Sequence, residues 1–313
     1  MRVLVVGASG AIGTRLVPQL IDRGHEVIGT FNSPGNTERV RALGAEPTAL
    51  DLLDARAVRQ AVLEAKPEAI VHQGDRSGEC ALRQEPRPQL RGDEPASDRG
   101  HRRAAGRRAR GRRAPVRRAE LRQLPLRARG RAGQDRERSA RPYPPASARE
   151  TSAAMSHLDQ AVTDAGGIAL RYGGFYGASN DGLVGPVRKR QLPIVGDGGG
   201  VSSFIHLDDA AAATVLALEH DRAGVYNIVD DEPAPTRDWL PVLANALDAK
   251  PPRHIPGWLA RLFMGEGLVM MTESRGASNA KAKRELGWTL RYPSWRHGFT
   301  AAYRQPRPLQ ARA

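Results

Sequence analysis

Apolar residues in the first 73 positions follow two periods in turn. Four short runs predict strands, at residues 2–6, 27–31, 45–50 and 69–72; all but the mixed run at 45–50 are mostly apolar. Between the first two runs, Ile12, Leu16 and Leu20 recur at helical spacing, and residues 55–65 repeat a helical pattern. Strands that alternate with helices predict a parallel sheet connected by right-handed crossovers.

The alternation returns after about residue 145, with a helical pattern at 155–162 and strands at 168–171, 203–206 and 225–229. Thr236 is the predicted N-cap of a later helix. We therefore predict an α/β chain with a doubly wound parallel sheet and a small C-terminal lobe. The predicted parts are half of the sheet domain at 1–73, an aberrant segment at 74–143, the rest of that domain at 144–185, the lobe with returning sheet elements at 186–303 and a tail at 304–313.

The segment between these ordered parts has a different composition. Residues 74–141 contain one valine, five leucines, and no isoleucine, methionine or aromatic residue. Such a composition cannot bury a core, so we predict that 74–143 is disordered. The segment also holds 21 arginines against nine acidic residues, a net charge of +12 that leaves +2 of the chain's +14 for all other residues.

A net charge of +14 on 313 residues raises the possibility of nucleic-acid binding. The arginines are not interleaved with aromatic residues that could stack on bases, so this function is disfavoured. The chain has no apolar stretch near the length of a membrane span and does not open like a signal peptide. Together with the single Cys80, these features favour a cytoplasmic protein without a membrane partner.

A glycine pattern, GASGAIG at 7–13, follows the first predicted strand and opens the first predicted helix. In this context the first glycine permits a tight turn, the second lets a pyrophosphate approach the backbone, and the third allows close helix–strand packing. The pattern predicts a Rossmann-type dinucleotide site. The residues expected to contact the dinucleotide are Gly7, Ser9, Gly10, Ala11, Ile12 and Gly13.

The second strand should place Asn32 and Ser33 beside the adenosine ribose. An acid at this place binds the ribose of NAD, and its absence here favours NADP as cofactor while leaving NAD open. Asp51 and Leu52 follow the third strand and could meet the adenine ring. Asp51 could equally be a turn residue that caps the next helix.

These features, with LRYGGFYG at 170–177 and FIHLDD at 204–209, resemble an atypical member of the extended short-chain dehydrogenase/reductase family, the NAD-dependent epimerase/dehydratase type. The resemblance covers residues 1–73 and about 145–300. It implies a doubly wound domain with a C-terminal substrate lobe. It also implies an acid/base tyrosine with a lysine four residues later, and a serine or threonine upstream that polarises the substrate oxygen.

The chain has six tyrosines, and none has a lysine four residues later. By spacing, the expected pair falls near Thr151 and Met155. Tyr172 and Tyr176 follow a predicted strand at the edge where α/β sites form, and are the alternative candidate proton donors. The competing interpretation is that both rings pack at the domain junction.

Arg188 and Arg190 lie in the presumed substrate lobe and could clamp a diphosphate, although such charge runs are more often solvated. His206 is a candidate substrate contact. We predict no metal at His206, Asp208 and Asp209, because Asp209 is expected to cap the following helix. The four tryptophans are expected to pack in cores. A small molecule is the expected ligand, and a homodimer is left open.

The arginine-rich segment coincides with the missing fourth crossover helix and fifth strand. Back-translated with freely chosen codons and read one nucleotide later, it gives an amphipathic helix followed by a strand, and from Arg117 the reading begins VAQSFAS. We therefore hypothesise two compensating frameshifts, near Gly74 and near 141–145. The chain is then predicted to be an NAD(P)-dependent oxidoreductase or epimerase-type protein for a sugar-like or small carbonyl substrate, with impaired activity. A catalytically inactive NAD(P)-binding protein is the alternative.

Overall fold

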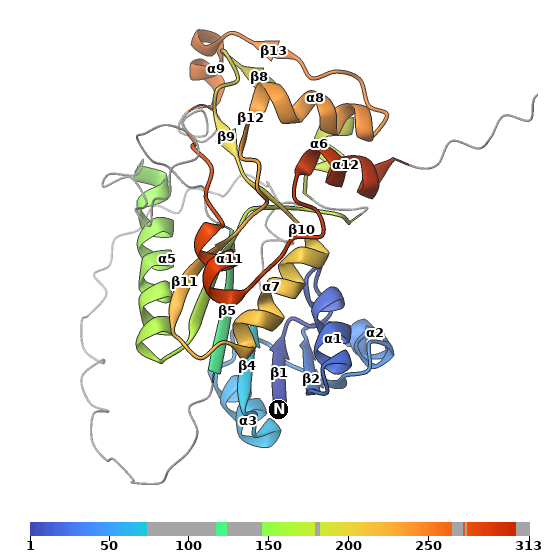
Figure 1. The fold of residues 1–313 in the computed structure, drawn as a ribbon, viewed down its shortest axis with the longest axis vertical. Helices are drawn as coiled ribbons and strands as arrows, with labels where there is room; N and C mark the ends of the chain where they lie inside the picture. The colour runs from blue at the N-terminus through green and yellow to red at the C-terminus, as the bar shows by residue number, and fades with distance from the viewer. Residues whose placement is uncertain (74–116, 124–145, 179–181, 265–271, 273, 305–313) are drawn as a thin grey trace, which may run out of the picture.

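The computed structural model describes residues 1–73, 117–123, 146–178, 182–264, 272 and 274–304. Its centre is one sheet of seven strands, all paired in parallel (Figure 1). In spatial order the strands are β11 (Gly224–Ile228), β6 (Ile168–Tyr172), β5 (Arg117–Gln123), β4 (Ala69–His72), β1 (Arg2–Val6), β2 (Glu26–Phe31) and β3 (Glu46–Ala49). The predicted doubly wound α/β fold is confirmed.

The strand order reverses beside β1, where the chain runs outward first through β2 and β3 and then through β4, β5 and β6. The registers align Val5 of β1 with Gly29 of β2 and with Val71 of β4. The carboxyl ends of β1, β2 and β4 therefore meet at one edge of the sheet, and this reversal is where doubly wound folds bind ligands.

The two faces of the sheet are covered by different helices. Val3 and Val5 face a core that includes α1 (Gly13–Asp22), α2 (Thr37–Ala42), α7 (Leu207–Glu219) and α11 (Ala280–Leu286). Leu4 and Val6 face α3 (Ala55–Ala65). The helix α5 (Ala146–Asp164) packs against β5, β6 and β11.

One seven-residue piece of the arginine-rich segment departs from the expectation of disorder. Arg117–Gln123 forms β5, aligned with β4 from Ala69↔Arg117 and with β6 from Ala119↔Ile168. The physical reason lies in the backbone: a strand between β4 and β6 pairs its N–H and C=O groups on both sides, whatever its side chains are. The rest of the prediction for 74–143 lies outside the described residues.

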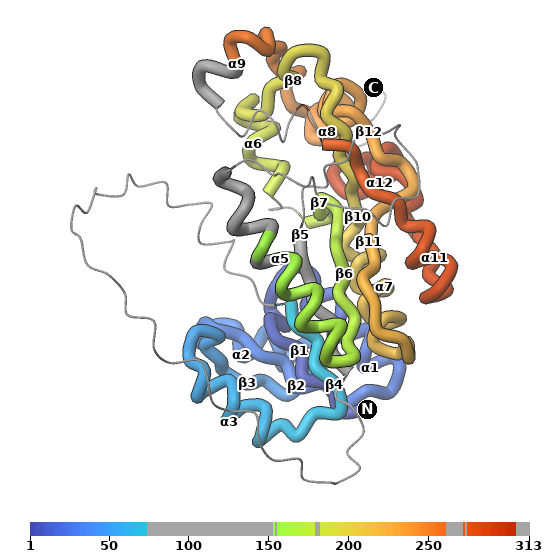
Figure 2. Tube along the Cα trace, turned by 90° about the vertical axis from the view of Figure 1, so that its left-hand side faces the viewer, coloured from blue at the N-terminus to red at the C-terminus, as the bar shows by residue number. Residues whose placement is uncertain are grey.

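The C-terminal lobe lies beyond the carboxyl edge of the sheet (Figures 1 and 2). Its core joins Phe204, Trp239, Trp295 and Phe299 around Tyr176. Its elements are short. They are β7 (Gly174–Tyr176), α6 (Val184–Arg188), β8 (Ile194–Val195), β9 (Val201–Ser202), β10 (Phe204–His206), β12 (Ala234–Pro235), α8 (Thr236–Ala246), β13 (His254–Ile255), α9 (Gly257–Met264) and α12 (Trp295–Tyr303). The 3₁₀ turn η1 (Pro34–Asn36) belongs to the sheet domain.

Two expectations about side chains are corrected here. Trp239, Trp288 and Trp295 are buried, but Trp258 on α9 is 69% exposed and does not pack in a core. Thr236 does not cap α8: Pro235 holds the N-cap position, and the Thr236 hydroxyl instead donates to the Gly200 carbonyl at 3.1 Å. Of the helices in the described residues, none combines the length and apolar character that a bilayer span demands.

Candidate functional site

The glycine turn that joins β1 to α1 is tightly packed. Gly7 has φ of +85°, a conformation that glycine adopts without a Cβ penalty. Its N–H donates to the Thr30 hydroxyl at 3.3 Å, which ties the turn to β2. A Cβ on Gly13 would lie 2.4 Å from the Gly7 carbonyl oxygen, so only glycine fits there. Gly10 is exposed at the top of the turn.

The start of α1 is open to an anion. Ile12 holds the N-cap position without a side-chain cap, and the first turn carries no acidic residue. The Thr14 and Arg15 N–H groups donate to the Gly10 and Ile12 carbonyls. The N–H groups just before them and the positive end of the helix dipole can therefore serve a phosphate. Of the remaining predicted contacts, Ser9 is half-buried, Ala11 is exposed and Ile12 is buried. This geometry fits the pyrophosphate of a dinucleotide.

Asn32 and Ser33 lie exposed immediately after β2, with the Ser33 hydroxyl donating to Asn32 Oδ1 at 3.4 Å. Asp51 accepts a hydrogen bond from the Leu53 N–H at 2.9 Å, so it lies in a turn, but the prediction that it could cap the next helix is wrong. The cap of α3 is Asp54, which accepts from the Arg56 and Ala57 N–H groups. Leu52 packs against the core under α3.

Tyr172 is a core residue of the sheet domain, 2% exposed. Its hydroxyl lies 2.5 Å from Thr214 Oγ1, and Thr214 donates in turn to the Ala210 carbonyl at 2.8 Å. The Thr214 oxygen is therefore the acceptor for the Tyr172 proton. Burial raises the pKa of Tyr172 well above its ordinary value. A buried phenol whose proton is already engaged is poorly placed to donate to a substrate.

Tyr176 lies in the core of the lobe and is fully buried. Its ring meets His206 and Phe299 edge-on, with centroids 5.2 and 5.0 Å apart. Burial and the nearby Asp230 raise its pKa far above its ordinary value. The surroundings of both tyrosines correspond to junction packing, and nothing in them supports the catalytic role expected from the sequence.

His206 is a structural residue at the start of α7. Its Nδ1 accepts a hydrogen bond from the Asp208 N–H at 3.1 Å, and burial lowers its pKa, so the neutral ring caps the helix. The expectation that Asp209 caps this helix is therefore wrong. Asp209 instead accepts from the Arg291 and Tyr292 N–H groups, both at 2.8 Å, and fastens the C-terminal segment to α7.

The two arginines predicted to bind substrate are not brought to the glycine turn. Arg188 is exposed at the last residue of α6. Arg190 has φ of +54°, and its Nε donates to the Pro251 carbonyl at 2.9 Å. The structure thus gives Arg190 a local role in holding α6 against the segment after α8.

Asp230 is a buried carboxyl that joins the sheet to the lobe. It accepts hydrogen bonds from the Trp295 N–H at 2.9 Å and the Glu232 N–H at 3.3 Å. Burial is the main reason that its pKa rises to about 8. A carboxyl with a raised folded-state pKa stabilises the fold fully below its unfolded value of about 4. That contribution declines as the pH rises and is lost above about 8.

We therefore expect the wild-type melting temperature to fall between pH 5 and pH 8.5, and to fall less in Asp230→Asn, because the amide cannot ionise. Tryptophan fluorescence melts at closely spaced pH values measure this, since Trp295 is a direct partner of Asp230. Asp22→Asn, an exposed position, is the matched control and should keep the wild-type slope. Parallel slopes in wild type and Asp230→Asn would contradict the assignment.

Sequence reasoning missed three features of this edge. The first-turn residues Arg15 of α1 and Asp208 of α7 form an ion pair at 3.4 Å, which holds the two helices together. Thr30 braces the glycine turn. Gln73, directly after β4, carries a buried amide. Its place at the carboxyl end of a strand next to β1 was the signal that could have identified it.

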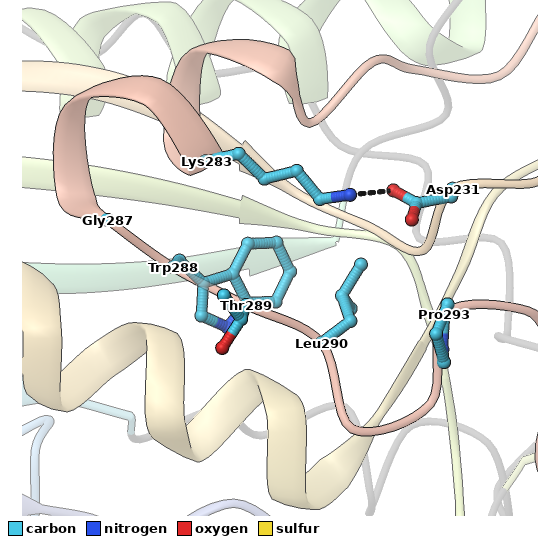
Figure 3. A pocket seen from close by; sticks show the side chains of 7 residues that line it. All are labelled: Asp231, Lys283, Gly287, Trp288, Thr289, Leu290 and Pro293. Atoms are coloured by element: carbon cyan, nitrogen blue, oxygen red, sulfur yellow. Dashed lines mark hydrogen bonds and ion pairs between the residues drawn. The ribbon is translucent and has the colours of Figure 1, made fainter.

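A surface pocket of about 450 Å³ lies elsewhere, between α11 and the segment that follows it (Figure 3). The Lys283 ammonium and the Asp231 carboxylate pair at 2.6 Å along one side, and the Trp288 side chain lines the other. None of the residues predicted to form the dinucleotide site lines this pocket. Among the residues that the structure describes, no three histidine, cysteine or acidic side chains are grouped to hold a metal.

Comparisons with known proteins are consistent with a dinucleotide site at the glycine turn. The sequence model of the NAD dependent epimerase/dehydratase family matches residues 3–88. Two similar solved structures are a dTDP-glucose 4,6-dehydratase of Bacillus anthracis in complex with NAD and a human epimerase family protein with NADPH. Each is 16% identical and covers 97% of this chain, with 95% and 99% of its own chain matched and TM-scores of 0.65 and 0.60. This likeness shows the fold.

A curated relative from a Streptomyces species is similar along the whole chain. It is a 3-diazoavenalumate denitrifying reductase, 36% identical over 314 residues, which covers 96% of this chain and 99% of the relative. The two chains are thus nearly equal in length. On this evidence the chain belongs to the NAD dependent epimerase/dehydratase family.

Proposed function

We propose that this protein is a reductase that binds NADPH at the carboxyl edge of β1, β2 and β4 and reduces a small, electron-poor substrate. The observation that carries the proposal is the glycine turn, in which the space at Gly13 and the uncapped start of α1 fit a pyrophosphate. The turn would hold the pyrophosphate, and Asn32 and Ser33 would meet the adenosine ribose. When bound, the nicotinamide supplies a hydride.

The missing Tyr–Lys pair favours reduction over epimerisation. An epimerase of this family must take a proton from a substrate hydroxyl, and the tyrosine does that work. Tyr172 and Tyr176, the two tyrosines expected to replace it, are both buried, and burial raises their pKa values. A reaction that needs no proton from the protein is compatible with such a site.

The name of the Streptomyces relative suggests a substrate class of this kind, a small aromatic diazo compound. In its diazonium form, the carbon accepts a hydride with its electron pair, and the carbon–nitrogen bond breaks with its pair leaving on N₂. The substrate is reduced, the nicotinamide is oxidised, and no side chain gives or takes a proton. A small carbonyl compound is the other candidate substrate. Hydride addition to its carbonyl carbon gives an alkoxide, which could take a proton from water.

Net cofactor consumption tests the proposal against its two rivals. A reductase oxidises one NADPH for each substrate consumed, which the loss of absorbance at 340 nm records. An epimerase regenerates its cofactor and shows no net loss. A catalytically inactive binding protein shows cofactor binding without turnover for any diazo or carbonyl compound. Either of the last two results would refute reduction.

We propose NADPH over NADH because the residues after β2 are neutral. Asn32 and Ser33 are exposed hydrogen-bonding side chains, and neither would repel a 2′-phosphate. Asn32→Asp should weaken NADPH binding by about tenfold or more, through repulsion of the phosphate, and should weaken NADH binding little. Fluorescence titration with both cofactors measures the ratio.

Asn36→Asp, in the same loop, is the matched control for added charge and should change the ratio less. A wild-type protein that binds NADH more tightly than NADPH would contradict the proposed preference. So would an Asn32→Asp variant whose ratio of the two affinities is unchanged.

We further propose that the chain as written has reduced activity, because its fifth strand comes from a shifted reading frame. Four of the seven residues of β5 are charged, with the sequence RRAELRQ. A central strand of a parallel sheet is normally a nearly continuous apolar run, because helices cover both faces. The equal length of the Streptomyces relative supports a replacement that preserved length.

A further inference from the structure

Gln73 lies at the carboxyl edge of the sheet, directly after β4. Its N–H donates to the Val6 carbonyl at 2.8 Å, which fixes it beside the last residue of β1 and so beside the glycine turn. The residue is 9% exposed. Both atoms of its amide are buried and have no hydrogen-bond partner in the described part of the chain. A buried amide without hydrogen bonds destabilises the folded state, so a group that supplies these bonds is expected at this edge.

The neighbours of this amide determine what it can offer. The Tyr172 hydroxyl is near enough for Gln73 to lower its pKa, although the two groups do not meet the distance and angle of a hydrogen bond. The Tyr172 proton is directed to Thr214, so Tyr172 can only accept from Gln73. A carboxamide has two donor hydrogens and one acceptor oxygen. At least one donor and the acceptor therefore remain for a ligand.

The position in the sheet indicates which part of the ligand this would be. β4 lies on the opposite side of β1 from β2, whose end carries Asn32 and Ser33. If the adenosine half lies over β2 and the pyrophosphate at the glycine turn, the second half extends toward β4. That half carries ribose hydroxyls and a carboxamide, which can both accept and donate.

We propose that Gln73 is a positioning residue whose carboxamide hydrogen-bonds the nicotinamide half of the bound dinucleotide. This inference rests on the proposed function. The amide would hold that half at the reacting edge, above the core formed by Tyr172 and Thr214. Its partner groups on the ligand are absent from 2′,5′-ADP, which contains only the adenosine half.

The test uses Gln73→Met, which keeps the length of the side chain and removes its hydrogen bonding. We expect NADPH binding to weaken about tenfold, while binding of 2′,5′-ADP stays at the wild-type value. The melting temperature without ligand should stay equal or rise, because an unpaired buried amide is removed. Gln60→Met, on an exposed face of α3, is the matched control and should change none of the three.

Four results would overturn the inference. Unchanged NADPH affinity in Gln73→Met would show that the amide does not contact the ligand. An equal loss for NADPH and 2′,5′-ADP, or a lower melting temperature without ligand, would show a structural role instead. If the wild-type protein binds neither ligand, the proposed function fails and this inference falls with it. Measuring both ligands on the wild-type protein therefore separates a failure of the proposed cofactor binding from a failure of the role assigned to Gln73.

Discussion

Gly13→Ala should remove dinucleotide binding, or weaken it at least about tenfold. The added Cβ would lie 2.4 Å from the Gly7 carbonyl oxygen and 2.5 Å from that of Ala8, distances that real Cβ atoms do not have. Relief requires α1 to move away from the turn that ends β1, and the start of α1 is the proposed anion site. We expect a loss of about 1–3 kcal/mol in unfolding free energy from this overpacking.

Fluorescence titration with NADPH and a thermal melt measure the two effects together. Gly185→Ala is the matched control, because a Cβ there meets nothing within 4 Å and its φ is not positive. It should bind NADPH as the wild type does. A Gly13→Ala protein with wild-type affinity would contradict the placement of the pyrophosphate at this turn.

Restoring the reading frame should have the second large effect. A gene corrected near codons 74 and 141–145 replaces RRAELRQ at β5 by VAQSFAS, which removes four charged residues from a central strand. Since helices cover both faces of a central parallel strand, which is therefore normally apolar, we expect the melting temperature to rise by roughly 10 °C or more. Turnover with NADPH should rise with it.

The matched control is a gene recoded synonymously through the same segment, which leaves the protein and its melting temperature unchanged. The nucleotide sequence gives an independent test. If no pair of compensating insertions or deletions separates this gene from those of its relatives, the frameshift is refuted. An equal or lower melting temperature after restoration would refute its structural consequence.

The sheet domain was predictable because its signals are local and strong. The strand Ala69–His72 and the helix Ala55–Ala65 have the bounds that their apolar patterns predict. Asp54 accepts from two N–H groups at the start of that helix, so a single side chain defines its beginning. The glycine turn was equally predictable, since backbone geometry at Gly7 and the space at Gly13 leave no alternative residue.

The lobe and the chemistry of the site were less predictable because they depend on contacts between distant residues. Strands of two residues, such as Ile194–Val195, are too short to show a period. Tyr172 and Tyr176 follow a strand at the edge where α/β sites form, and only packing shows that both are buried. Asp209 precedes the predicted helix as a cap would, yet it lies inside α7 and its partners lie 82 and 83 positions away.

The origin of the hydrogen in the product tests the central claim, hydride transfer without a proton donor from the protein. The frame-restored protein is supplied with an aromatic diazonium substrate and NADPH deuterated at the transferable position of the nicotinamide, in ordinary water. We expect one deuterium on the carbon that lost nitrogen, and none there when unlabelled NADPH is used in D₂O. Deuterium drawn from the solvent, or product without net NADPH oxidation, would contradict the account.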